Sequence, residues 1–145
     1  MIGMTTFSTS RLSAAPPAAV FAAIENPERL ARWWGPNGFS NNFQVFEFKP
    51  QGNWVFDMVG PDGSVYPNAS VFSVIEPDRR VVIEHVCAPF FVLGIVLEPA
   101  ATGTLVVWEQ TFADAAVAQA VRHIVEPANE QNLDRLGVEL ERGAA

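Results

Sequence analysis

Residues 46–58 read FEFKPQGNWVFDM and hold the clearest pattern in the sequence. Large apolar side chains occupy every second position on either side of a short polar stretch, at Phe46, Phe48, Trp54, Phe56 and Met58. Alternation with period two is typical of a strand that buries one face. The polar residues 51–53 between the two runs favour a turn. The segment therefore predicts an antiparallel hairpin with an aromatic face.

The same period continues toward the C-terminus. Further strands are predicted at about residues 65–75, 81–86, 89–97 and 104–112, separated by turns that contain proline, glycine or aspartate. Six strands in succession without an intervening helix imply an antiparallel meander. Residues 4–13, which precede this meander, read as a separate first strand.

Two short helices are predicted between the first strand and the hairpin. Pro16 and Pro17 favour a helix at 18–24, because the N–H groups of a first helical turn have no partner within the helix. Asn26 followed by Pro27 is a start signal for a second helix, which ends at residues 35–36.

The tail from 114 to 142 reads as helical and carries two apolar stripes. They consist of Val117, Val121, Ile124 and Ala128, and of Leu133, Leu136 and Leu140. Pro127 lies between the stripes. The sequence therefore predicts either two helices, with Pro127 in the first turn of the second, or one kinked helix.

Several local motifs resemble one known group of proteins. They are LARWWGP at 30–36, FEFKPQGNW at 46–54, GPDG at 60–63, EPDRR at 76–80 and PANEQNLDRL at 127–136. Together they resemble the START-like (SRPBCC) superfamily, in particular the bacterial stand-alone members of the branch named for the activator of heat-shock protein 90 ATPase. The resemblance implies an α+β helix-grip fold. In that fold a curved antiparallel sheet of about seven strands wraps around a long C-terminal helix, with two short helices after the first strand.

The resemblance implies one helix-grip domain over residues 1–145. Members of the superfamily bind lipids, sterols, polyketides and other hydrophobic molecules, and some catalyse cyclisation or hydrolysis. One fold therefore carries many functions, so the activity has to be argued from the site.

Charge and composition exclude several classes of partner. The formal charge is -7, from 9 basic and 16 acidic residues, which argues against nucleic acid or an anionic membrane as the main partner. The single cysteine, Cys87, excludes an internal disulfide and favours the cytoplasm, and it is expected to be a buried structural thiol. The longest apolar run, residues 86–97, is too short to span a bilayer, so no membrane insertion is expected.

Alternation also places polar side chains on the inner face of the sheet. If Glu84 faces water, His85 faces inward, and the charge of Glu109 turns Trp108 and Gln110 inward in the same way. The predicted ligand cavity consists of Trp34, Phe46, Phe48, Trp54, Phe56, Met58, Tyr66, His85, Trp108, Gln110, Asn129 and Leu133. Two alternatives stay open: His85 as a partly buried residue bonded to backbone, and Trp108 as core packing without ligand contact.

No catalytic residue, metal site or cofactor is predicted. The two histidines, His85 and His123, lie 38 positions apart, and the sequence contains only one cysteine. This is not a usual metal-ligand spacing. There is no glycine-rich phosphate loop and no serine–histidine arrangement for a nucleophile. His123, Glu47 and Glu84 are expected to be exposed to solvent.

Three functions follow from these observations. The first is binding of a small hydrophobic molecule, such as a lipid, polyketide or aromatic metabolite, without catalysis. The second is an enzyme of cyclase or hydrolase type, with His85 as base and Gln110 or Asn129 as orienting groups. The third is a chaperone-related interaction module that uses the Trp33-Trp34 corner, or a homodimer formed through an apolar face at Val92, Gly94 and Val96.

Overall fold

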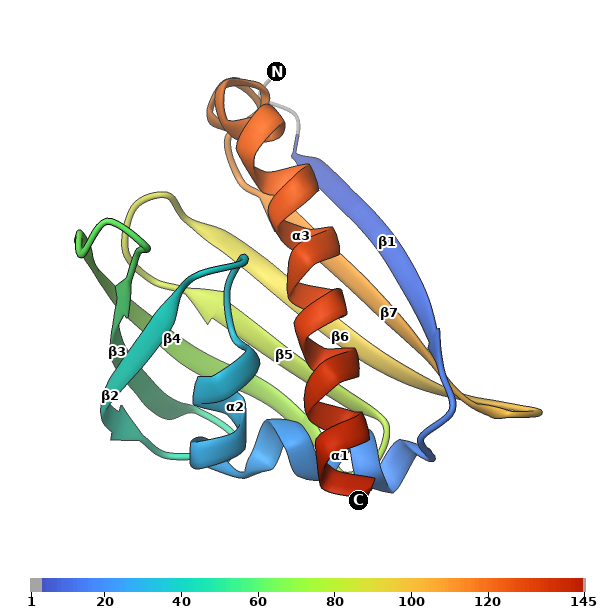
Figure 1. The fold of residues 1–145 in the computed structure, drawn as a ribbon. Helices are drawn as coiled ribbons and strands as arrows, with labels where there is room; N and C mark the ends of the chain where they lie inside the picture. Colours follow the sequence, from blue (N-terminus) through green and yellow to red (C-terminus); the bar gives the residue numbers. More distant parts are fainter. Residues whose placement is uncertain (1–3, 145) are drawn as a thin grey trace.

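The computed structural model describes residues 4–144, and Figure 1 shows the arrangement of the elements. In chain order they are β1 (Thr5–Ser13), α1 (Pro17–Glu25), α2 (Pro27–Trp33), β2 (Ser40–Phe46), β3 (Gly52–Val59), β4 (Val65–Glu76), β5 (Arg80–His85), β6 (Phe91–Ala100), β7 (Gly103–Phe112) and α3 (Ala115–Ala144). The predicted order of strands and helices is confirmed.

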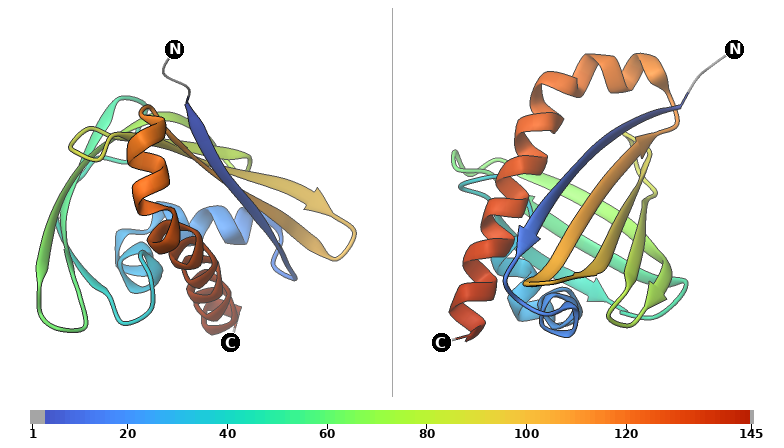
Figure 2. Two further views of the ribbon diagram at one scale, coloured as in Figure 1. Left: turned by 90° about the horizontal axis from the view of Figure 1, so that it is seen from above. Right: turned by 90° about the vertical axis from the view of Figure 1, so that its right-hand side faces the viewer.

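All seven strands form one antiparallel sheet, in the order β1-β7-β6-β5-β4-β3-β2. The first strand closes one edge by pairing with the last, from Thr5 opposite Phe112 to Ser13 opposite Thr104. Register shifts between Phe43 and Val45 in β2, and between Phe72 and Val74 in β4, mark irregularities that bend strands. The sheet curves around α3, as Figure 2 shows, and the predicted helix-grip fold is confirmed.

The two short helices begin at the predicted signals. The side-chain oxygen of Asn26 accepts hydrogen bonds from the backbone N–H groups of Glu28 and Arg29, at 3.0 and 3.2 Å. This cap satisfies two donors that the first turn of α2 leaves free. The indole N–H of Trp33 donates to the carbonyl of Ala23 at 2.9 Å and so joins α2 to α1.

The C-terminal helix is one element with Pro127 inside it. The prediction of two separate helices is wrong, whereas the kinked helix is confirmed, since Figure 2 shows α3 changing direction along its length. Pro127 has no N–H to donate and its ring crowds the preceding turn, which bends a helix. The predicted first stripe needs one correction: Ile124 is 60% exposed, and the buried position of this half is Ala118.

The core lies between the concave face of the sheet and the helices. Leu133, Leu136 and Leu140 of α3 are buried in it, as predicted. Its largest part is aromatic, with the Trp54 ring stacked on Phe56 and on Phe72 at centroid distances of 4.3 and 5.5 Å. Leu93, Ile95 and Leu97 point into this core, so the alternate residues of β6 face away from it.

Candidate functional site

A pocket of about 240 Å³ lies between the concave face of the sheet and the first half of α3. We call it the inner pocket. Its apolar wall includes Trp34, Phe56, Met58, Ile83, Phe91, Leu93 and Trp108, and its polar residues are Asn68, Ser70, His85, Gln110, Asn129 and Asn132. The pocket thus combines an apolar wall, which contains four large aromatic side chains, with a few polar groups, and this is the usual make-up of a small-molecule site.

The structure brings together most of the residues that the sequence predicts for a cavity. The inner pocket is lined by Trp34, Phe56, Met58, His85, Trp108, Gln110 and Asn129 from that set. Three others, Phe46, Phe48 and Trp54, belong to the aromatic core instead. Leu133 lines a different hollow, on the β1 side of α3. Tyr66 is 49% exposed and lies against Phe39, with ring centroids 6.0 Å apart.

His85 is fixed by hydrogen bonds at both ring nitrogens. Nδ1 lies 2.7 Å from the carbonyl oxygen of Pro89, and Nε2 lies 2.8 Å from Oδ1 of Asn68. The Asn68 amide nitrogen donates to the Tyr66 carbonyl at 2.8 Å, which orients its oxygen toward His85. Both ring nitrogens therefore face an oxygen atom of the protein. The interpretation of His85 as a buried histidine bonded to backbone is confirmed.

Cys87 lies beside this histidine. Its sulfur is 3.4 Å from Nε2 of His85. The residue is only partly buried, so the prediction of a buried thiol is wrong. It lies two residues beyond the end of β5, outside the regular part of the strand.

Three side-chain donors of the inner pocket make no hydrogen bond within residues 4–144. The Gln110 side-chain oxygen accepts from the Asn129 amide at 3.1 Å, while the Gln110 amide nitrogen makes no hydrogen bond there. The Ser70 hydroxyl also makes none, and the Trp108 indole N–H is buried without a partner. Gln110 is 8% exposed, Ser70 3% and Trp108 2%. Donors in such buried residues normally have a partner, so these three are candidates to bind a ligand acceptor.

Ser70 and Asn68 were missed by the sequence interpretation. They lie two and four positions before the buried Phe72 on β4, so period two places all three on one face of the strand. Ser70 also pairs with His85 in the register of β4 and β5. The alternation around Phe72 was the signal that could have identified them.

The wall at Trp34 is held in place by polar contacts from α3. The Arg135 guanidinium donates to the backbone carbonyls of Arg32, Trp34, Gly35, Pro36 and Phe39, at 2.8 to 2.9 Å. Burial lowers the pKa of Arg135. Asn132 adds a bond to the Trp33 carbonyl at 2.9 Å and accepts one from the Gly35 N–H at 3.1 Å. These contacts fix the turn that presents Trp34 to the pocket.

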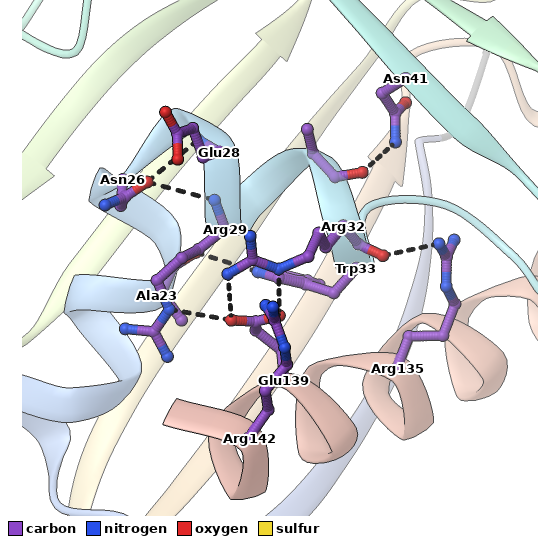
Figure 3. A network of polar contacts seen from close by, with 11 residues as sticks. Ala23, Asn26, Glu28, Arg29, Arg32, Trp33, Asn41, Arg135, Glu139 and Arg142 are labelled. Atoms are coloured by element: carbon purple, nitrogen blue, oxygen red, sulfur yellow. Dashed lines mark hydrogen bonds and ion pairs between the residues drawn. The ribbon is translucent and has the colours of Figure 1, made fainter. Parts of the chain in front are cut away.

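A buried carboxylate completes the link between α3 and α2, as Figure 3 shows. Glu139 accepts hydrogen bonds from Arg32 at 2.8 and 2.9 Å and from Arg29 at 2.9 Å. The hydrogen bonds from Arg32 contribute most to the low pKa of Glu139, which is about 2, and the bond from Arg29 adds to the shift. Burial opposes it. The sequence interpretation missed this network, because the paired residues lie more than a hundred positions apart.

Residues 4–144 hold no group of three or more metal-ligating side chains. None of the helices in this part of the chain is both long enough and apolar enough to cross a membrane.

The family profile described as "Activator of Hsp90 ATPase homolog 1-like protein" matches residues 14–141. The chain belongs to this family. The resemblance that the sequence motifs indicated is therefore confirmed. Among curated proteins, no sequence matches this chain.

Solved structures share the fold of this Activator of Hsp90 ATPase homolog 1-like chain at low sequence identity. A protein from Nitrosomonas europaea is 19% identical, with a TM-score of 0.88 over 96% of each chain. One from Arthrobacter aurescens is 23% identical, with a TM-score of 0.88 over 94% of this chain and 86% of its own. An AHSA1-like protein from Aeromonas hydrophila is 16% identical, with a TM-score of 0.75 over 97% and 94%. At such identities the likeness concerns the fold alone.

Proposed function

We propose that the protein binds a small, largely aromatic molecule in the inner pocket and that it does not catalyse a reaction on it. The observation that carries this proposal is the set of three donors without a partner, those of Ser70, Gln110 and Trp108, in a pocket with a largely apolar wall. An apolar ligand would leave all three donors without a partner, which is costly. The ligand should therefore carry a hydrogen-bond acceptor, such as a carbonyl or ether oxygen.

The size of the inner pocket supports a compact ligand. Its volume of about 240 Å³ lies below the range of roughly 300–1,000 Å³ that is usual for ligand sites. Lipids and sterols need more room than this. An aromatic metabolite with one or two rings is the class that suits both the volume and the wall.

The enzyme alternative is less well supported by the contacts of His85. A general base needs a lone pair that is free to take a proton. Both ring nitrogens of His85 instead face the oxygens of Pro89 and Asn68. The same contacts suit a residue that keeps the pocket wall rigid.

The interaction-module alternative lacks an exposed tryptophan corner. Trp33 is 1% exposed, and Trp34 packs against the core and lines the inner pocket. A homodimer through the outer face of β6 and a cytoplasmic location stay predictions. Light scattering of the purified protein and cell fractionation would test them.

A matched pair of ligands tests the proposed function. Indanone and indane share one bicyclic shape, and indanone alone carries a carbonyl acceptor. We expect indanone to raise the melting temperature more than indane does, because a ligand that binds the folded state stabilises it by mass action. Decanoate and cholesterol serve as the lipid arm and are expected to give no displacement of indanone.

Gln110→Leu removes the donor and keeps the size of the side chain. It should reduce the affinity for indanone about fivefold, as expected for one neutral hydrogen bond, and leave indane binding unchanged. Gln119→Leu is the matched control, since Gln119 is an exposed residue of α3 outside the pocket. Equal binding of the two ligands by the wild type, or no binding of either, would refute the proposal.

A further inference from the structure

A second hollow, of about 520 Å³, runs along the other side of α3. We call it the outer groove. It lies between β1, the start of α1 and the second half of α3, and its apolar floor includes Ala15, Ala19, Val106, Leu133, Leu136 and Leu140. The outer groove is larger than the inner pocket, and no residue lines both hollows. The proposal below does not rest on the function proposed for the inner pocket.

A glycine in the middle of α3 faces this groove. Gly137 has no left-handed backbone conformation that would require glycine. A β-carbon added to it would meet no atom within 4 Å, so no close neighbour requires glycine either. Glycine inside a helix destabilises it by about 1 kcal/mol relative to alanine. Its presence therefore fits a hollow that is kept open for an occupant.

The two ends of the outer groove differ in charge. At one end, Arg11 is neutralised by ion pairs with Glu130 and Asp134 at 3.1 and 2.7 Å. At the other end, Arg29 uses only its Nε atom, in the bond to Glu139. Its two terminal nitrogens make no hydrogen bond within residues 4–144, and Arg29 lines the groove. The end of the groove at Arg29 thus offers guanidinium N–H donors that have no partner in residues 4–144.

Arg29 pairs with Glu139 through Nε at 2.9 Å, but no carboxylate within residues 4–144 bonds to its terminal nitrogens. Glu139 is already within ion-pair distance of three guanidinium groups, those of Arg29, Arg32 and Arg142. Glu141 lines the same groove but forms no ion pair within residues 4–144. A guanidinium group binds a carboxylate through two parallel hydrogen bonds, so a carboxylate is the natural partner here.

We propose that the outer groove binds a medium-chain carboxylate. The carboxylate pairs with the terminal nitrogens of Arg29, and the alkyl chain lies on the apolar floor beside Gly137. The lining residues of α3 extend from Leu133 to Gly143, which corresponds to roughly 15 Å of helix. A straight chain such as that of decanoate matches this length and the apolar side chains of the floor.

Titration calorimetry with sodium decanoate and with decanol tests the proposal on the full chain. The two probes share their apolar chain and differ in the charged group. We expect saturable binding of decanoate and about tenfold weaker binding of decanol, because charge-assisted hydrogen bonds exceed neutral ones. Arg29→Gln should bring the two affinities close to each other, with folding checked by circular dichroism. Glu141→Gln, which removes a nearby negative charge, should strengthen decanoate binding.

Gly137→Leu fills the groove and suits a helix, so it should raise the melting temperature and abolish decanoate binding. Val138→Leu is the matched control, because Val138 is 67% exposed and does not line the groove. Unchanged binding by the Gly137→Leu variant would overturn the proposal. So would a loss of decanoate binding in Gln110→Leu, since that result would assign decanoate to the inner pocket. Indanone binding by the Gly137→Leu variant should stay unchanged.

Discussion

Replacing Glu139 with glutamine is expected to destabilise the fold by about 3 kcal/mol at neutral pH. The carboxylate is 4% exposed and accepts three hydrogen bonds from Arg29 and Arg32. Glutamine keeps the size of the side chain but removes the charge, and its amide nitrogen faces guanidinium donors. Removing one partner from a buried ion pair typically costs about 3–5 kcal/mol.

The pKa of Glu139 gives a second estimate of how much this carboxylate stabilises the fold. In the folded protein the pKa is lowered from 4.5 to about 2. Since each tenfold change in proton affinity is worth about 1.4 kcal/mol, this lowering corresponds to about 3 kcal/mol of stability. The stabilisation is complete above the unfolded-state pKa. It is lost as the pH falls from 4.5 to 2, because the unfolded chain takes up the proton first.

Urea unfolding followed by tryptophan fluorescence measures both effects. The free energy of unfolding of the wild type should exceed that of Glu139→Gln by about 3 kcal/mol at neutral pH. This difference should shrink between pH 4.5 and 2. Glu130→Gln is the matched control on the same helix: its pair with Arg11 is solvent-exposed and should contribute less than about 1 kcal/mol. Equal losses in the two variants, or a difference that does not depend on pH, would refute the reasoning.

Three further predictions concern the stability of the fold. Arg135→Lys should cost about 2–3 kcal/mol in urea unfolding and weaken indanone binding, because the single ammonium group of lysine cannot bond all five carbonyls that the two terminal nitrogens of Arg135 hold. Gly52→Ala should cost at least about 3 kcal/mol, since a β-carbon would lie 1.9 Å from the Glu47 carbonyl oxygen; normal thermal stability would contradict this. Trp108→Phe should be about 1–2 kcal/mol less destabilising than Trp33→Phe, because the Trp108 N–H is buried without a partner and the Trp33 N–H is bonded. Equal decreases of the melting temperature in the Trp108→Phe and Trp33→Phe variants would contradict this prediction.

The fold was largely predictable because its signals are local. Alternation with period two and the turn residues between strands place each strand, and the proline at the start of α1 and the Asn26 cap of α2 place the short helices. The long helix was less predictable. Proline excludes one hydrogen bond, but whether the helix continues past it depends on packing of both halves against the sheet. That packing joins residues far apart in the chain.

For the site, period two predicts the face of a strand but not the depth of a residue. Tyr66, Ser70 and Phe72 share one face of β4, yet their exposed fractions are 49%, 3% and 0%. Helix α3 covers the middle of the sheet and not the end of the β3–β4 hairpin, so Tyr66 reaches solvent while Ser70 lines the inner pocket.

The polar residues that fix the site illustrate the same limit from the helix side. Asn132, Arg135 and Glu139 recur at intervals of three and four residues, so they share one face of α3. In a sequence, such a stripe is typical of a solvated surface. Here it packs against α2 and the following turn, where backbone carbonyls and two arginines complete its hydrogen bonds. Whether a polar stripe is buried depends on such distant partners, and the inner pocket exists because this stripe holds α3 close to Trp34.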